Sequence, residues 1–233
     1  MAGSLENASA QDVARAADEY TAAGDWWGLA GARRRQADLA RAGGDLGHAE
    51  EYLRAALSLY VMLDDGYCAG RALTSLAEIR LAAGDYPAAA ELSRQAAERM
   101  PGDTMALTGL AYAEWQAGSP ADAEVTFSQA LHWDADDAAA LAGRGQVRAD
   151  LGSSSLALDD LDRALKYPLD RESEADARSA RALALAGLGR SAEAQAELAE
   201  SVRLDPRRPR TRLRADRIAA LAGDRREPGD MRL

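Results

Sequence analysis

The chain has 233 residues, enough for one or two ordinary domains, and 47% of them are hydrophobic although only 5% are aromatic. Alanine and leucine must therefore build the core, and such a composition with few β-branched residues favours helix throughout. The net charge of −10 at pH 7 argues against a general nucleic-acid binder.

The features that report on cellular location predict a cytoplasmic protein. Cys68 is the single cysteine, which excludes an intrachain disulfide and suits a reducing compartment. Residues 1–11 have neither the basic start nor the apolar run of a signal peptide. The longest apolar stretch, residues 57–63, is too short to span a bilayer, so no membrane insertion is expected.

Helices separated by short turns are expected along nearly the whole chain. Gly24 ends the first helix, because glycine readily takes the left-handed conformation of a helix end, and Asp25 is placed to cap the next one. The same Gly-Asp pair recurs at residues 44–45, 84–85 and 223–224. The expected helices span residues 11–23, 26–42, 46–63, 66–83, 87–99, 103–117, 120–133, 137–151, 154–166, 172–188, 191–204 and 210–222.

An internal repeat organises the middle of the chain. Shifting the sequence by 34 residues from Gly70 superimposes small and large apolar residues at matching positions. The coincident pairs are Leu73 with Leu107, Leu76 with Leu110, Ala77 with Ala111, Gly84 with Gly118, Ala89 with Ala123 and Ala96 with Ala130. Further copies begin near Ala138 and Ala175, and the earliest repeats are longer, with a spacing of 40 residues.

This pattern resembles the tetratricopeptide repeat, and the resemblance covers about residues 30–206. It implies an all-α fold, a right-handed α-solenoid of about five helix pairs with an N-terminal helix and a C-terminal capping helix. A single domain is expected over residues 11–222, between flexible ends at residues 1–10 and 223–233. The expected helix pairs are 26–63, 66–100, 103–134, 137–167 and 172–205, followed by the capping helix 210–222.

Packing within each helix pair suggests two specific expectations. Ala77, Ala89, Ala111, Ala123, Gly145 and Ala157 supply the close approach of paired helices. Ala123→Leu is therefore expected to cost about 1–3 kcal/mol through overpacking. Arg144 and Arg181 stand at positions that are normally apolar, and an acid follows each by 16 residues on the partner helix. Half-buried ion pairs to Asp160 and Glu197 are predicted.

No constellation of catalytic or ligand-binding residues stands out, so the chain is not expected to be an enzyme or to bind a metal or cofactor. His48 and His132 are the only histidines, and neither belongs to a spaced ligand set. Phosphate-binding glycine loops and GxSxG elbows are absent from the sequence. Residues 153–155 and 134–137 are interpreted as helix caps and not as a nucleophile or a calcium loop.

The resemblance implies a binding groove lined by the first helix of each repeat. In this register the candidate residues are Arg34, Asp38, Arg41, Arg71, Thr74, Glu78, Leu81, Met105, Thr108, Tyr112, Trp115, Ala142, Gln146 and Ala149. The lysine and asparagine clamp of chaperone-binding members is missing. The groove is expected to take a peptide or helix with acidic and apolar residues. Tyr112 and Trp115 either anchor that partner or pack against a neighbouring helix, and the sequence leaves the two interpretations open.

Two remaining features are interpreted as structural. Trp26 and Trp27 are expected to anchor the core of an irregular first repeat, and the alternative is that one packs on the N-terminal helix while the other is exposed as a dimer or partner contact. The basic C-terminal segment is interpreted as the solvated outer face of the capping helix, because no aromatic residue is interleaved for stacking on nucleic acid. Its arginines are Arg203, Arg207, Arg208, Arg210, Arg212, Arg214, Arg217, Arg225 and Arg226.

The predicted function is a non-enzymatic scaffold or adaptor for protein–protein interaction. The alternative is a ligand- or peptide-responsive regulatory sensor, since the resemblance extends to bacterial repeat proteins with 40-residue units. The sequence leaves open the identity of the partner and whether the chain forms a homo-oligomer.

Overall fold

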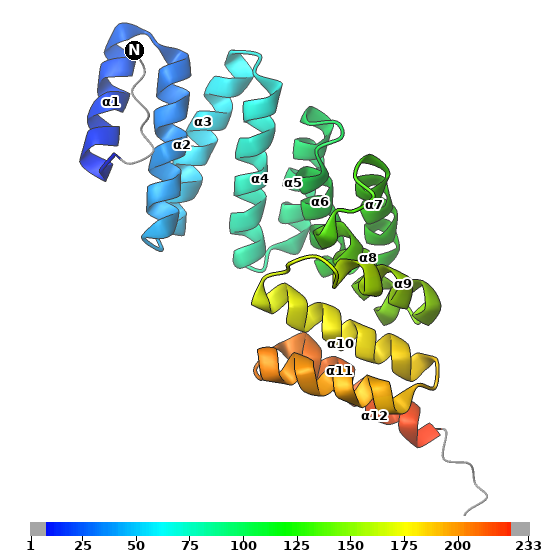
Figure 1. Cartoon of the computed structure of the whole chain (residues 1–233). Helices are drawn as coiled ribbons and strands as arrows, with labels where there is room; N and C mark the ends of the chain where they lie inside the picture. Colours follow the sequence, from blue (N-terminus) through cyan, green and yellow to red (C-terminus); the bar gives the residue numbers. More distant parts are fainter. Residues whose placement is uncertain (1–7, 225–233) are drawn as a thin grey trace, which may run out of the picture. The chain divides into compact units, whose positions relative to one another are not determined.

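The computed structural model describes residues 8–224, and this part of the chain consists of α-helices and short turns without a strand (Figure 1). The predicted all-α fold is confirmed, and each expected helix begins and ends within two residues of an observed one. The helices are α1 (Ala10–Ala23), α2 (Trp26–Ala42), α3 (Leu46–Met62), α4 (Gly66–Ala82), α5 (Tyr86–Arg99), α6 (Thr104–Gln116), α7 (Pro120–Trp133), α8 (Ala138–Asp150), α9 (Ser154–Ala164), α10 (Arg171–Gly187), α11 (Ser191–Leu204) and α12 (Pro209–Asp224).

The chain divides into two compact units, residues 1–117 with α1–α6 and residues 118–233 with α7–α12. They are called the N-terminal unit and the C-terminal unit below. The single domain over residues 11–222 stays a prediction. The flexible ends expected at 1–10 and 223–233 fall mostly on residues 1–7 and 225–233, which lie outside the described residues, as do Arg225 and Arg226.

Helix starts in the N-terminal unit follow one rule every 20 residues. The carboxylate that precedes the helix accepts a hydrogen bond from the backbone N–H three residues later, which satisfies one unpaired donor of the first turn. The caps are Asp25 to Gly28 at 2.8 Å, Asp45 to His48 at 3.1 Å, Asp65 to Cys68 at 2.9 Å and Asp85 to Ala88 at 3.3 Å. These contacts fix the expected helix boundaries.

The residue before each of these caps has a positive φ. Gly24, Gly44 and Gly84 take φ values of 69°, 80° and 75°, which glycine adopts without steric cost. Asp64 occupies the same place with φ 56° and is the one non-glycine residue with positive φ in the part of the chain that is described. The turn geometry is therefore dictated by the repeat and not by the glycine alone.

Small residues build the core of the N-terminal unit, as the composition predicted. Consecutive helices pack against each other, with α2 against α3 and α4 against α5 as the closest pairs. One buried cluster joins Ala37 of α2, Ala49 and Leu53 of α3, and Leu76 and Ile79 of α4. Alanine at the contact lets the helix backbones approach closely while leucine fills the space beside it.

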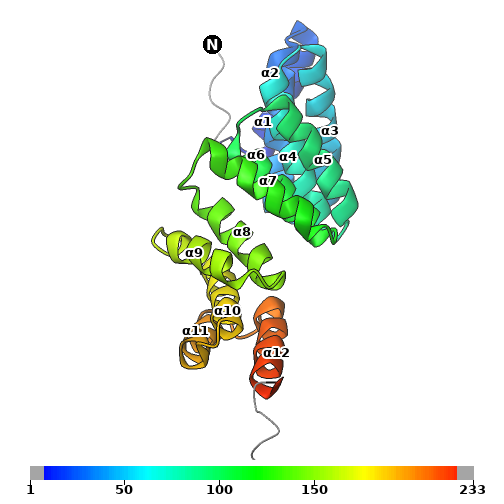
Figure 2. The ribbon, with the colours of Figure 1, turned by 90° about the vertical axis from the view of Figure 1, so that its right-hand side faces the viewer.

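The C-terminal unit uses glycine for the same purpose. Gly145 of α8 lies against Leu161 of α9, and an added Cβ would stand 2.7 Å from the leucine Cγ. Gly143 lies under the buried ring of Phe127 of α7, where a Cβ would stand 2.2 Å from Cζ. The helix pairs α8–α9 and α10–α11 are thus locked by close contacts, and α12 packs mainly against α10 (Figure 2).

Both predicted ion pairs are present in the C-terminal unit. Arg144 of α8 holds Asp160 of α9 with two hydrogen bonds of 2.9 and 2.8 Å. Arg181 of α10 donates to Glu197 of α11 at 2.9 Å. Each pair links the two helices of one repeat, as the spacing of 16 residues indicated. Among the described helices, none combines the length and the apolar character needed to cross a bilayer.

Candidate partner-binding site

A hollow of about 370 Å³ lies on the N-terminal unit, between the first helices of successive repeats. Helices α2 and α4 and the start of α6 contribute most of its lining, and these helices follow one another in Figure 1. The lining residues are Arg34, Arg35, Asp38, Arg41, Arg71, Thr74, Ser75, Glu78, Met100, Asp103, Met105 and Ala106. The face that the repeat register assigned to a groove is therefore hollowed in this unit.

Many of the predicted site residues come together in this hollow. Those that line it are Arg34, Asp38, Arg41, Arg71, Thr74, Glu78 and Met105. Sequence reasoning missed Arg35, Ser75 and Ala106 on the lining helices, and Met100 and Asp103, which precede α6 in the turn from α5. The signal was present in Gly70, because the buried Met100 side chain fills the space that a Cβ on this glycine would take. That contact places the turn at the floor of the groove.

Two of the carboxylates in the hollow already have partners. Glu78 of α4 binds Arg41 of α2 at 2.5 Å, which ties the two helices together across the groove face. Asp103 accepts the backbone N–H of Ala106 at 2.9 Å and so caps α6. Among the described residues, only Glu78 of these carboxylates is therefore neutralised by an ion pair, while Asp103 keeps its charge as a helix cap and Asp38 is a third carboxylate of the lining.

Arg34 and Arg71 remain without an ion pair among residues 8–224. Both line the hollow, and both guanidinium groups are exposed. Guanidinium groups in such a position attract carboxylates, because the planar fork of N–H donors matches two carboxylate oxygens. The lining holds four arginines against the three carboxylates of Asp38, Glu78 and Asp103, so the hollow has an excess of one positive charge on a chain whose net charge is −10.

The positive charges of Arg34 and Arg71 also act on Cys68 at the start of α4. Burial raises the pKa of the Cys68 thiol, and the two arginines oppose that effect without overcoming it. The side chain therefore stays a thiol at neutral pH and is a poor nucleophile. Among the described residues, no group of three His, Cys, Asp or Glu side chains is arranged to hold a metal ion.

The remaining predicted site residues lie outside the hollow. Tyr112 and Trp115 stand farther along α6, with ring centroids 6.3 Å apart and ring planes inclined by 36°. Thr108 is buried on the same helix, and its hydroxyl oxygen has no hydrogen-bond partner among the described residues. Gln146 belongs to α8 of the C-terminal unit and is buried with an unpaired side-chain oxygen. A binding role for these residues stays a prediction.

The expectation that Trp26 and Trp27 anchor the core is wrong. Their exposed fractions are 44% and 59%. Helices α1 and α2 instead close around Val13, Ala17, Leu29 and Ala32, with Tyr20 packed where a Cβ on Gly28 would lie. The missing side chain of Gly28 makes room for the Tyr20 ring, so this contact is filled by a tyrosine of α1 and not by either tryptophan.

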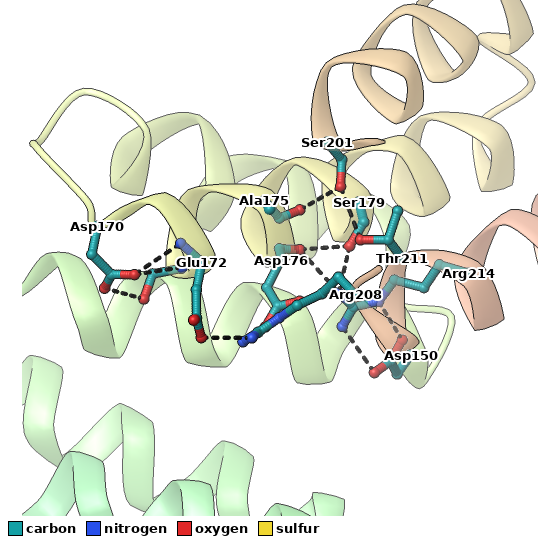
Figure 3. Close-up of polar contacts among 11 residues, drawn as sticks. Asp150, Asp170, Glu172, Ala175, Asp176, Ser179, Ser201, Arg208, Thr211 and Arg214 are labelled. Atoms are coloured by element: carbon teal, nitrogen blue, oxygen red, sulfur yellow. Dashed lines mark hydrogen bonds and ion pairs between the residues drawn. The ribbon is translucent and has the colours of Figure 1, made fainter. Parts of the chain in front are cut away.

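The interpretation of the basic C-terminal segment as a solvated face is also wrong in part. Arg214 of α12 is 1% exposed, and its guanidinium group spans α8 and α10 (Figure 3). It donates to both oxygens of Asp150 at 3.1 Å and to Ser179 Oγ at 2.9 Å. Arg208 binds Asp176 of α10 through two hydrogen bonds of 3.1 and 2.8 Å. These arginines attach α12 to the unit.

Sequence comparison identifies repeats over most of the chain. Two profiles of the tetratricopeptide repeat match it, one over residues 80–151 and the other over residues 34–104 and 143–209. No curated protein sequence matches the chain significantly.

Solved structures share the fold at low sequence identity. BtubC (BKLC) from P. vanneervenii has 19% identity and a TM-score of 0.67, over 99% of this chain and 96% of that one. A tetratricopeptide repeat protein from Parabacteroides merdae has 20% identity and a TM-score of 0.64, over 83% and 73%. YrrB, a tetratricopeptide repeat protein with an unusual peptide-binding site, has 18% identity and a TM-score of 0.63, over 90% and 100%. Given the profile matches and the stacked helix pairs, this chain belongs to the tetratricopeptide repeat family.

Proposed function

We propose that the chain is a scaffold that binds a peptide or helix of a partner protein in the hollow of the N-terminal unit, through acidic and apolar residues of that segment. Tetratricopeptide repeats are in general modules of protein–protein interaction, and the finer assignment rests on one observation. Arg34 and Arg71 line the hollow while no carboxylate of residues 8–224 pairs with them. A carboxylate from outside the chain would complete the charge balance.

The two methionines of the lining support the expectation that the ligand contributes apolar side chains. Met100 forms a buried floor, and Met105 is 62% exposed at the rim. Methionine is flexible and polarisable, so it adapts to leucine, methionine or aromatic side chains of different shapes. A volume of about 370 Å³ suits a few anchoring side chains and not a whole folded domain. The proposal therefore describes a short linear segment, and YrrB offers a related fold with a peptide-binding site.

The proposal includes a cytoplasmic location and a preference for protein over nucleic acid. Acidic peptides and nucleic-acid phosphates both carry negative charge, so charge alone does not distinguish them. The apolar side chains of a peptide, which contact the methionines of the hollow, provide the distinction. A peptide that combines glutamate with leucine should bind, whereas a single-stranded oligonucleotide of equal charge should not.

A matched peptide panel tests the proposal. The probes are fluorescent eight-residue peptides of glutamate and leucine, with counterparts in which glutamine or lysine replaces glutamate, and binding is read by anisotropy. The chain should bind the glutamate peptide most tightly. Arg34→Ala with Arg71→Ala should weaken that binding by about tenfold or more, since hydrogen bonds to charged groups contribute roughly 1.5–3 kcal/mol each.

The control variant removes equal charge elsewhere on the same unit. Arg15 and Arg94 form exposed ion pairs with Asp12 and Glu91, at 2.7 Å each, outside the hollow. Arg15→Ala with Arg94→Ala should leave the affinity within about twofold. Equal losses in both double variants, or equal binding of the glutamate and glutamine peptides, would refute the proposed site.

A separate variant examines the aromatic pair beyond the hollow. Tyr112→Ala with Trp115→Ala should reduce recovery of native partners in a pull-down if these rings extend the binding surface. Unchanged recovery from a folded variant would confine the site to the hollow and would assign the rings to packing.

A further inference from the structure

We infer that the C-terminal unit carries a second binding face, of opposite charge to the hollow, which accepts an arginine-bearing helix and is filled by α12 of the same chain. This acidic face comprises Asp150 of α8 and Glu172, Asp176 and Ser179 of α10. The inference is independent of the proposed function of the N-terminal unit.

Two residues of the acidic face, Asp176 and Ser179, occupy register positions that line the hollow in the other unit. Asp176 follows Arg71 by 105 residues and Met105 by 71, through whole repeats of the sequence. Ser179 stands in the same relation to Thr74. Since Arg71, Thr74 and Met105 line the hollow, Asp176 and Ser179 belong to the face that a ligand would approach. That face is covered by α12 (Figure 3).

Arg214 is the centre of this contact. Its Nε and Nη2 donate to the two oxygens of Asp150, both at 3.1 Å. Its Nη1 donates to the backbone carbonyl of Asp176 and to Ser179 Oγ, both at 2.9 Å. One guanidinium group therefore satisfies acceptors on two different helices, as a bound ligand does with a recognition surface.

Two further arginines complete the contact at either side. Arg208 binds Asp176 at 2.8 Å and Glu172 at 2.6 Å. The hydrogen bonds that Arg208 donates to Asp176 raise the pKa of Arg208, so its guanidinium group stays protonated at physiological pH. Arg217 donates to Asp150 Oδ1 at 3.3 Å and to its carbonyl at 3.0 Å. The acidic face thus binds arginines at positions i, i+6 and i+9 of the segment that covers it, which are Arg208, Arg214 and Arg217.

The apolar contribution of α12 is small for a helix that closes a repeat array. Within residues 209–221 of α12 the buried side chains are Thr211, Arg214 and Ile218, and Leu213 is 63% exposed. Thr211 contacts Ser201 Oγ at 3.0 Å. A contact dominated by arginine anchors, with Ile218 as the buried aliphatic side chain and Ala215 and Leu221 half-buried, has the composition of a protein–protein interface and not of a core. Another helix with the same arginines can therefore replace α12.

A peptide with the sequence of residues 206–224 tests the inference in trans. The full chain with Arg208→Glu and Arg214→Glu should release its own α12, because glutamates would face Asp150 and Asp176. The labelled peptide should then bind this variant with micromolar affinity. It should bind the parent chain at least about 100-fold more weakly, because the tethered α12 competes at a millimolar effective concentration.

Matched controls separate binding from general charge effects. Arg207→Glu with Arg212→Glu changes the same segment by the same charge, but both side chains are exposed. This variant should keep α12 in place and should not bind the peptide. A peptide with glutamine at the positions of Arg208, Arg214 and Arg217 should bind none of the proteins. Failure of the arginine peptide to bind the folded Arg208→Glu and Arg214→Glu variant would overturn the inference.

If the variant with Arg208→Glu and Arg214→Glu does not fold, hydrogen exchange on the parent chain tests whether α12 is replaceable. The inference predicts that amides of α12 exchange faster than those of α10 and α11, because α12 leaves while the rest of the unit stays folded. Identical protection in α12 and α10 would show that α12 opens only with the whole unit. That result would make it an integral part of the core and would contradict the proposed replaceable ligand.

Discussion

Asp160→Ala offers a sharp test of how the C-terminal unit is held together. The Asp160 side chain is 4% exposed and lies between two arginines of α8. It accepts hydrogen bonds from Arg144 Nε and Nη2 at 2.9 and 2.8 Å and from Arg148 Nη1 at 2.8 Å. Arg144 also reaches Ser128 of α7 at 3.1 Å. One carboxylate of α9 therefore organises contacts among three helices.

The expected cost follows from which charges lose a partner. Asp160→Ala leaves the largely buried Arg144 without a carboxylate, whereas Arg148 keeps Glu124 at 2.7 Å, and breaking such a pair from one side costs about 3–5 kcal/mol. Arg144→Ala leaves Asp160 still bound to Arg148, so it should cost less, about 1–3 kcal/mol. Because both changes remove the same contact, the double variant should be more stable than the sum of the single losses predicts, by about 1–2 kcal/mol.

Urea unfolding of the full chain, followed by circular dichroism at 222 nm, measures these free energies of unfolding when the m-values agree. Arg190→Ala is the control, since its ion pair with Glu193 is exposed on the surface and should contribute less than about 0.5 kcal/mol. Losses for Arg144→Ala and Asp160→Ala that add within about 0.3 kcal/mol would refute the reasoning, because independent sites add and coupled ones do not.

Three further predictions address packing, a turn and pH. Ala123→Leu at a fully buried position of α7 should lower the free energy of unfolding by about 1–3 kcal/mol through overpacking, and an unchanged melting curve would disprove the assigned register. Asp64→Gly should raise the melting temperature, because relief of the positive φ contributes roughly 0.5–1 kcal/mol, and a lower value would contradict this. Hydrogen bonding to Arg54, together with the charge of Arg80, lowers the pKa of Glu50 below 4.5. The stability that Glu50 contributes is therefore complete above pH 4.5 and is lost as the pH falls through the pKa of Glu50 in the folded state. In Glu50→Gln the melting temperature should depend less on pH in this acid range. An unchanged pH dependence would exclude this ion pair as its source.

The sequence was sufficient to predict the helices and the ion pairs within repeats. Helix ends follow from local chemistry, since Gly84 and Asp85 act through contacts within a few residues. The pair of Arg144 and Asp160 was also predictable, because a polar residue at an apolar register position must find a partner on the adjacent helix. Both inferences depend on short-range geometry that repeats along the chain.

The site could be predicted only as a face, because its depth depends on side chains from separate turns. Met100 enters the hollow from the turn before α6, and no periodic pattern marked it. Trp26 and Trp27 were misplaced because hydrophobicity alone does not reveal that Gly28 closes the gap between α1 and α2. The buried state of Arg214 depends on Asp150, which lies 64 residues away. Such contacts become visible only in three dimensions.

Charge reversal at the hollow tests the central claim most directly. The double variant Arg34→Glu with Arg71→Glu converts the unpaired positive charge of the lining into negative charge. Anisotropy titrations with the glutamate–leucine and lysine–leucine peptides should show that this variant loses the acidic peptide and gains the basic one, by about tenfold or more in each direction. Unchanged preference for the acidic peptide in the folded variant would contradict recognition through Arg34 and Arg71.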